Sequence, residues 1–188
     1  MNLQKFEDAQ FDIMHGDLLL YRRAGLIAWA GRGKHSHAAK VAWWDGQLMC
    51  MEIREFHGGR IVTLESQVRQ FPERIDVYRA DAQNRWPHFN RHGSVEFMRQ
   101  FAGSRYGYKA MLMTALTRVP IPFAWRYFRP ELDDNACGGD NPPFCSQAVA
   151  MSDRLGGGVD PVPNLADHFC EPADLARSAF YEYQFTLG

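Results

Sequence analysis

The sequence predicts an α+β fold in which a mainly antiparallel sheet of about six strands packs against three or four helices. Short apolar runs bounded by turn residues mostly follow one another along the chain, which favours antiparallel neighbours. The dipeptide Asp45-Gly46 separates two of these runs and is a strong hairpin signal. A small-residue apolar run begins at Cys145 and stops at the glycines 156–158, as expected for a buried helix.

Length and composition favour one globular domain over residues 1–188. Of the 188 residues, 46% are hydrophobic, which is enough for a substantial core. The formal net charge is −1 and no basic stripe is visible, so nucleic acid is not expected as a partner. No run approaches the roughly 18 apolar residues of a membrane span, so stable membrane insertion is not expected.

The beginning of the chain lacks the long apolar core of a signal peptide. The expected location is therefore cytoplasmic, with export by another route left open. The four cysteines show no tight pair spacing, so reduced thiols are expected rather than a disulfide framework: Cys50, Cys137, Cys145 and Cys170. No cofactor is implied, and no pattern indicates the oligomeric state.

Strands are expected mainly in the first half of the chain. Gly16-Asp17 forms a turn ahead of one apolar run, and Gly58-Gly59 forms a turn ahead of another. The return run after Asp45-Gly46 places Leu48, Cys50 and Glu52 on one face, because side chains alternate along a strand. The expected strands are 18–21, 35–44, 47–53, 60–64, 74–79 and 180–187.

Helices are expected at 26–30, 94–101, 145–155 and 171–177. Ser94 is the expected N-cap of the second, and Pro172 suits the first turn of the last. Between the expected helices 94–101 and 145–155, residues 109–141 form an insertion that begins apolar, is broken by prolines and ends acidic and glycine-rich. Two interpretations of this insertion remain open: it packs on the core, or it walls a substrate groove.

Cys145 is the candidate nucleophile. Two prolines, Pro142 and Pro143, lead into the helix and put Cys145 in its first turn. The positive end of the helix dipole favours the thiolate, which is the nucleophilic form of cysteine. The alternative is a buried structural cysteine, and that alternative is the interpretation given to Cys50, Cys137 and Cys170.

The predicted hairpin supplies a base and an orienting group. Pairing outward from Asp45-Gly46 brings His37, on the first strand, to within about two residues of Glu52 on the second. A carboxylate beside an imidazole holds its tautomer and stabilises the imidazolium. The competitors are His35, on the same strand face as His37 if the strand extends that far, and Glu55 in place of Glu52.

These residues together resemble the circularly permuted branch of the NlpC-type, papain-like cysteine amidases and peptidases. Gly16-Asp17 precedes an apolar strand, Ser36-His37 opens the next, Glu52 lies on its hairpin partner, and Phe144-Cys145-Ser146-Gln147 opens a late helix. The order His, polar orienter, Cys is that of the permuted branch. Residues 103–106 (Gly-Ser-Arg-Tyr) resemble the family's Gly-x-x-Tyr segment, and 172–178 resemble its C-terminal segment.

The resemblance implies a permuted papain-like fold and hydrolysis of an amide or peptide bond through a thioester. Cys145 is then the nucleophile, His37 the base and acid, and Glu52 the orienter. Tyr106 and the Cys145 amide are the expected oxyanion donors, with a core aromatic as the alternative interpretation of Tyr106. The implied substrates are cell-wall peptides or acylated small molecules. The strand after His37 is less branched-aliphatic than is usual in the family, and the 109–141 insertion is long.

Three alternatives come from other classes of protein. A metal site would use the imidazoles of His35 and His37 with Cys137 and Cys145, although the spacing is not that of usual zinc sites. An acyltransferase or thioesterase would use the same triad on lipid-like substrates, with 111–125 as the apolar wall. A non-catalytic binding protein would keep the fold, and its Cys145 would react no faster than the other cysteines.

Overall fold

The structure is a computed structural model that describes residues 2–22, 33–108, 142–163 and 165–188. The expected helix at 26–30, Cys137 and the insertion at 109–141 lie outside these residues.

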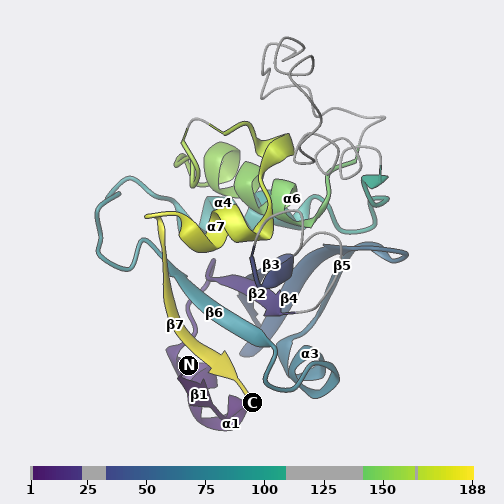
Figure 1. Ribbon diagram of the computed structural model, residues 1–188, viewed down its shortest axis with the longest axis vertical. Coiled ribbons are helices and arrows are strands. Elements are labelled where there is room, and N and C mark those ends of the chain that lie inside the picture. The colour runs from purple at the N-terminus through teal and green to yellow at the C-terminus, as the bar shows by residue number, and fades with distance from the viewer. Residues whose placement is uncertain (1, 23–32, 109–141, 164) are drawn as a thin grey trace.

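The α+β class is confirmed, with one seven-stranded mixed sheet among the described residues (Figure 1). The strand order is β1-β7-β6-β2-β3-β4-β5. All neighbouring strands are antiparallel except β1 and β7, which are parallel. The two-residue strand β1 is also the one strand that the sequence did not indicate. The strands are β1 (Leu3–Gln4), β2 (Leu18–Arg22), β3 (His35–Trp44), β4 (Gln47–Arg54), β5 (Gly58–Thr63), β6 (Ile75–Ala80) and β7 (Tyr181–Leu187).

The helices lie in two groups, one against each face of the sheet. Helices α4, α6 and α7 pack together over one apolar face, whereas α3 and the N-terminal helices cover the other (Figure 1). None of the helices in the described residues is long and apolar enough to cross a membrane. They are α1 (Phe6–Ala9), α3 (Leu64–Gln70), α4 (Arg91–Arg99), α6 (Cys145–Met151) and α7 (Pro172–Arg177), with the 3₁₀ turns η1 (Gln10–Asp12) and η4 (Asp167–Phe169) and the π-helical segment η3 (Ser152–Gly156).

The hairpin of β3 and β4 forms as predicted and fixes the register of the site. Asp45 has φ 47° and Gly46 has φ 76°, and two consecutive positive φ angles are what a two-residue hairpin turn requires. Trp44 pairs with Gln47 at the turn, and five residues further out Ala39 pairs with Glu52.

The N-terminus of α4 corrects one prediction. Asn90, not Ser94, is the N-cap, and its side chain accepts a hydrogen bond of 2.8 Å from the Gly93 amide. Ser94 lies one turn into the helix, where it is fully buried. Its hydroxyl donates to Asp153 (2.7 Å) and accepts from Lys40 (2.8 Å), so tertiary packing claims a residue that is locally suited to a cap.

Lys40 and Asp153 form a fully buried ion pair that joins the sheet to the helices. Lys40 lies in the middle of β3, and its ammonium donates to Asp153 of η3. Asp153 also accepts from the hydroxyls of Ser94 and Tyr181. The pair therefore ties β3, α4, η3 and β7 together. Burial costs such a pair much of its Coulomb energy, but these hydrogen bonds satisfy the groups that water would otherwise solvate.

Removing one partner of this pair should be far more damaging than removing an exposed one. We expect Lys40→Met to lower the free energy of unfolding by about 3–5 kcal/mol, because Asp153 is left buried without its cation. The control is Arg69→Met, which breaks the exposed i,i+4 pair with Glu65 and should cost about 1 kcal/mol or less. Urea unfolding of the two variants measures the difference, and equal losses would contradict the prediction.

Candidate active site

Cys145 is the first residue of α6 and lies at the junction of that helix with the sheet. The extended backbone of Phe144 leads into the helix, and the Phe144 amide donates to the Gln147 side chain (3.4 Å). The helix continues through η3, so a continuous helical stretch follows the thiol. Cys145 is fully buried, packed with Phe144 and Tyr106 in the core beneath α4, α6 and α7.

His37 joins the thiol to the sheet. It lies near the start of β3, and its Nε2 is 2.5 Å from Glu52 Oε2. A side-chain hydrogen bond also links His37 to Cys145. Because Glu52 occupies Nε2, the Nδ1 atom is the one left for the thiol. The structure therefore places Cys145, His37 and Glu52 in a row, on α6, β3 and β4, as the sequence led us to expect.

The electrostatics of the row favour a protonated imidazole. Burial by itself lowers the pKa of His37, but the charge of Cys145 and the hydrogen bonds to Cys145 and Glu52 outweigh it and raise the pKa to about 10. An imidazolium at neutral pH is the partner that stabilises a thiolate. The side chain of His37 keeps 17% of its surface exposed, whereas Cys145 and Glu52 are covered.

Arg60 is a member of this site that the sequence indicated only as part of the strand 60–64. Its guanidinium donates twice to Glu52 Oε1, with Nε at 2.8 Å, while His37 takes the other carboxylate oxygen. Burial raises the pKa of Glu52, but the bonds and charges of His37 and Arg60 lower it to about 2. Glu52 and Arg60 are direct partners in the ladder between β4 and β5. Knowledge of that register would have assigned Arg60 to the site.

Tyr21 holds the imidazole from the side. Its ring meets that of His37 edge-on, with centroids 5.1 Å apart. Its hydroxyl contacts Cys50 Sγ at 3.3 Å and Gln67 Oε1 at 3.5 Å. The position of Tyr21 opposite His37 in the β2–β3 ladder explains the contact, and that pairing could not be obtained from the sequence.

Tyr106 lies near the thiol. It is 7% exposed and belongs to the same core cluster as Cys145. Burial raises the pKa of Tyr106, and the nearby charges of Cys145 and Glu55 raise it further, so its hydroxyl keeps its proton and remains a hydrogen-bond donor. Glu55, the alternative orienter, is therefore on the Tyr106 side of the site, and it is Glu52 that bonds His37.

The prediction that His35 shares a face with His37 is wrong. In the ladder with β2, His37 pairs with Tyr21 and His35 with Arg22, so an extra residue of β3 bulges between them. The bulge turns His35 to the opposite face, where its Nε2 is 2.8 Å from Asp76 Oδ2. His35 is therefore not available as the base for Cys145.

The metal alternative finds no support in the described residues. With His35 and His37 on opposite faces, the pair on which that alternative depended is separated. Across the described ranges, no three His, Cys, Asp or Glu side chains are grouped so that they could hold a metal ion. Cys50 is close to the site but contacts Tyr21, and burial with the nearby Glu52 charge raises the pKa of the Cys50 thiol well above its usual range.

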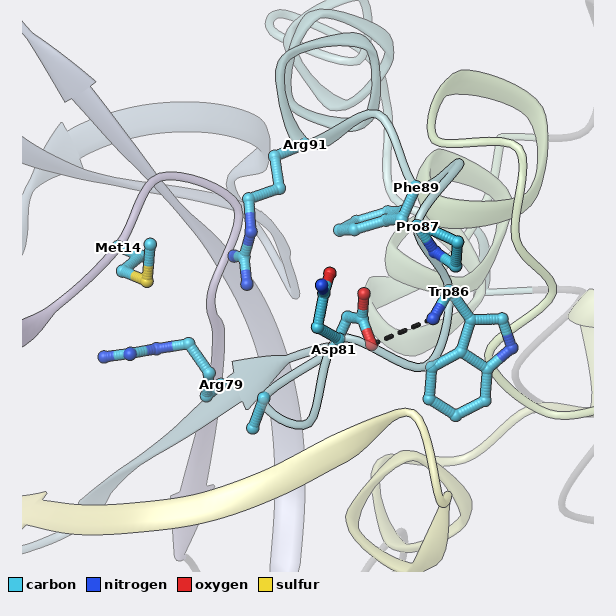
Figure 2. A pocket seen from close by; sticks show the side chains of 9 residues that line it. Met14, Arg79, Asp81, Trp86, Pro87, Phe89 and Arg91 are labelled. Carbon is cyan, nitrogen blue, oxygen red and sulfur yellow. Dashed lines mark hydrogen bonds between the residues drawn. The ribbon is translucent and has the colours of Figure 1, made fainter.

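A hollow lies near the end of β2 opposite to the one that pairs with His37. It has a volume of about 300 Å³ and is lined by Met14, Arg79, Asp81, Ala82, Asn84, Trp86, Pro87, Phe89 and Arg91 (Figure 2). Arg79 and Arg91 both donate to the buried Asp17, at the start of β2, whereas His37 pairs near the end of β2. The two arginines also bond backbone carbonyls, so this region is a clamp around Asp17.

Comparison with known proteins supports the fold alone. No protein-family model matches the sequence, and no curated protein matches it. Among solved structures, the crystal structure of metalloprotein yiiX from Escherichia coli O157:H7 (DUF1105) is similar, with a TM-score of 0.52 and 11% sequence identity. The match covers 92% of this chain and 97% of that one. At this identity the similarity shows a shared fold and carries no activity or ligand to this chain.

The titration of His37 should depend on Cys145. We expect NMR to show a pKa for His37 well above 6.5 in the wild-type protein, and a marked fall in Cys145→Ala, because the charge and hydrogen bond of Cys145 are the largest of the contributions that raise it. The Cys50→Ala variant removes a neighbouring buried thiol that does not bond His37 and should leave the titration unchanged. Identical His37 titrations in the wild-type protein and Cys145→Ala would show that the two side chains are not coupled.

Arg60 should control how Glu52 responds to acid. Since the folded-state pKa of Glu52 is about 2 against an ordinary value of 4.5, ionised Glu52 contributes stability above pH 4.5 that is lost as the pH falls through 2. We expect Arg60→Met to raise that folded-state pKa, so that the loss begins at higher pH and stability at neutral pH is reduced. Unfolding by urea between pH 2 and 6 measures this.

The matched control for Arg60 is Arg54→Met. Arg54 Nη1 is 3.8 Å from the same Glu52 oxygen, and its guanidinium lies over the ring of Phe71. Its removal should move the acid transition less than Arg60→Met does. If the two profiles coincide, the bidentate contact of Arg60 has no special role.

Proposed function

We propose that this protein is a cysteine hydrolase with the permuted papain-like, NlpC-type fold, and that it cleaves amide or peptide bonds. The observation that carries the proposal is the row Cys145–His37–Glu52, assembled from three separate elements with the carboxylate on the far side of the imidazole. A thiol, a base and an orienting group within hydrogen-bond reach of one another are the signature of an activated nucleophile.

The reaction begins from a thiolate–imidazolium couple, in which His37 already holds the proton of the Cys145 thiol. The sulfur then bonds the carbonyl carbon of the substrate, and the carbonyl oxygen becomes an oxyanion. The Cys145 backbone amide and the Tyr106 hydroxyl are the donors that we propose stabilise it. When the C–N bond breaks, His37 gives its proton to the departing amine, which leaves a thioester on Cys145.

Water completes the cycle. His37 takes a proton from a water molecule, whose oxygen attacks the thioester carbon, and cleavage of the C–S bond releases the acid and restores the Cys145 thiolate beside the His37 imidazolium. Glu52 remains ionised throughout, held by Arg60, and stabilises the imidazolium form of His37. Because Cys145 is fully buried, neighbouring groups must move aside before a substrate reaches the sulfur. The proposed substrates are peptides or acyl-amides.

Thiol labelling tests the proposal without knowledge of the substrate. We expect iodoacetamide, applied to the native protein between pH 4 and 9, to label Cys145 fast below pH 7, and His37→Ala to abolish that advantage. Mass spectrometry reads each cysteine separately, so the buried Cys50 and Cys170 serve as internal controls. Labelling of Cys145 no faster than these two, or only near pH 8.5, would contradict the proposal.

Activity gives the second measurement on the same proposal. With a panel of short peptide amides, Cys145→Ala should lower kcat/KM on the order of 10³-fold or more, as loss of a nucleophile does. The variant Cys170→Ala removes another buried thiol of the same core, which lies outside the Cys145–His37–Glu52 row, and it should keep the activity.

A further inference from the structure

We propose that Phe56, together with Tyr108, forms an aromatic platform that receives a flat or extended apolar group of the substrate beside Cys145. The ligand chemistry is an uncharged aromatic ring or an acyl chain attached near the scissile carbonyl. This inference rests on the proposed thiol chemistry and adds to it the residues that select the substrate.

The first observation is the backbone of the β4–β5 turn. Phe56 has φ 65°, in the left-handed region that bulky side chains rarely adopt. The other non-glycine residues with positive φ in the described part of the chain are all Asp, Asn or Glu. Phenylalanine therefore costs free energy at this position that glycine or asparagine would not. A strained residue of this kind points to a role outside folding.

The second observation is exposure. The side chain of Phe56 is 89% exposed, the largest fraction of any large hydrophobic residue in the described ranges. It therefore adds almost nothing to the core. Phenylalanine at this position gains no free energy from core packing and is disfavoured by its backbone conformation. Contact with an apolar ligand would bury the ring and supply a favourable free energy that the free protein lacks.

The third observation is a line of aromatic rings from Phe56 to the thiol. The Phe56 amide donates to the Tyr108 hydroxyl at 2.8 Å, and the two ring centroids are 6.1 Å apart. The Tyr108 and Tyr106 rings follow at 4.8 Å, and Tyr106 lies beside Cys145. Tyr108 is itself 44% exposed, so the line leads from the surface to the reacting sulfur.

The turn is held rigidly against the segment that precedes the site. The Gly59 amide donates to the Ser104 carbonyl at 2.8 Å, and a Cβ at Gly59 would lie 1.7 Å from the Phe101 carbonyl oxygen. The Gly107 amide in turn donates to the Pro143 carbonyl, two residues before Cys145. Backbone contacts thus fix the position of Phe56 relative to the nucleophile, as a specificity residue requires.

Alkylating agents of different shape test the platform directly. Iodoacetamide, N-phenyl iodoacetamide and N-octyl iodoacetamide all alkylate a thiol with loss of iodide and differ only in the apolar group. After correction for their rates with glutathione, we expect Cys145 to prefer at least one of the two apolar reagents by about 10-fold or more. Phe56→Ala should reduce the preference to about twofold, and the reagent preferred identifies a ring or a chain.

Two further variants make the result decisive. Phe11→Ala removes another exposed phenylalanine, in η1, and it should keep the preference. The helix α1 that precedes η1 lies at the opposite end of the molecule from α6 (Figure 1). Phe56→Gly should lose the preference and also raise the midpoint of thermal unfolding, because glycine relieves the left-handed backbone. A structural role for Phe56 would instead lower that midpoint.

The outcomes separate the two proposals. If Cys145 reacts fast with iodoacetamide but its preference among reagents is unchanged by Phe56→Ala, the platform is overturned and the thiol chemistry stands. If Cys145 reacts no faster than Cys50 and Cys170 with any reagent, the thiol chemistry fails and the platform fails with it.

Discussion

The buried carboxylate of Glu52 is the constraint on which the site depends. A carboxylate without water is unfavourable unless charged partners surround it, and Glu52 has one on each oxygen, His37 and Arg60. These partners come from β3 and β5, the two neighbours of β4 in the sheet. The charge therefore holds three strands in one register at the place where the imidazole must face α6.

Strand β3 connects this site to the stability of the whole molecule. Near its start His37 bonds Glu52 and Cys145, and in its middle Lys40 bonds Asp153 of η3. Cys145 begins α6, and η3 directly continues that helix. The helical stretch is thus tied to β3 at two points, by the imidazole at its first residue and by the buried ion pair.

Burial shapes the chemistry as much as geometry does. Cys145 has no exposed surface, and His37 is mostly covered, so charges in the row are weakly screened by water. That environment strengthens the interaction between thiol and imidazole, and it explains why the same burial that would lower the pKa of an isolated His37 is overcome. From this covered centre a line of aromatic rings leads outward through Tyr106 and Tyr108 to Phe56.

The sequence by itself was sufficient where local rules act. Asp45-Gly46 requires positive φ at both positions, which fixed the hairpin and, by counting residues, brought His37 close to Glu52. The alternation of side chains along a strand predicted that Cys50 and Glu52 share one face. The prolines before Cys145 and the glycines after it predicted where the helix begins and ends. These features depend on backbone preferences that a few neighbouring residues determine.

Only the tertiary structure decided the rest, because it depends on pairing between distant residues. The bulge in β3 that turns His35 away arises in the ladder with β2, and Arg60 reaches Glu52 through the ladder between β4 and β5. Ser94 became a core residue because Lys40 and Asp153 lie against it. Burial, which sets the charge state of His37, is likewise a property of the packed molecule and not of any stretch of sequence.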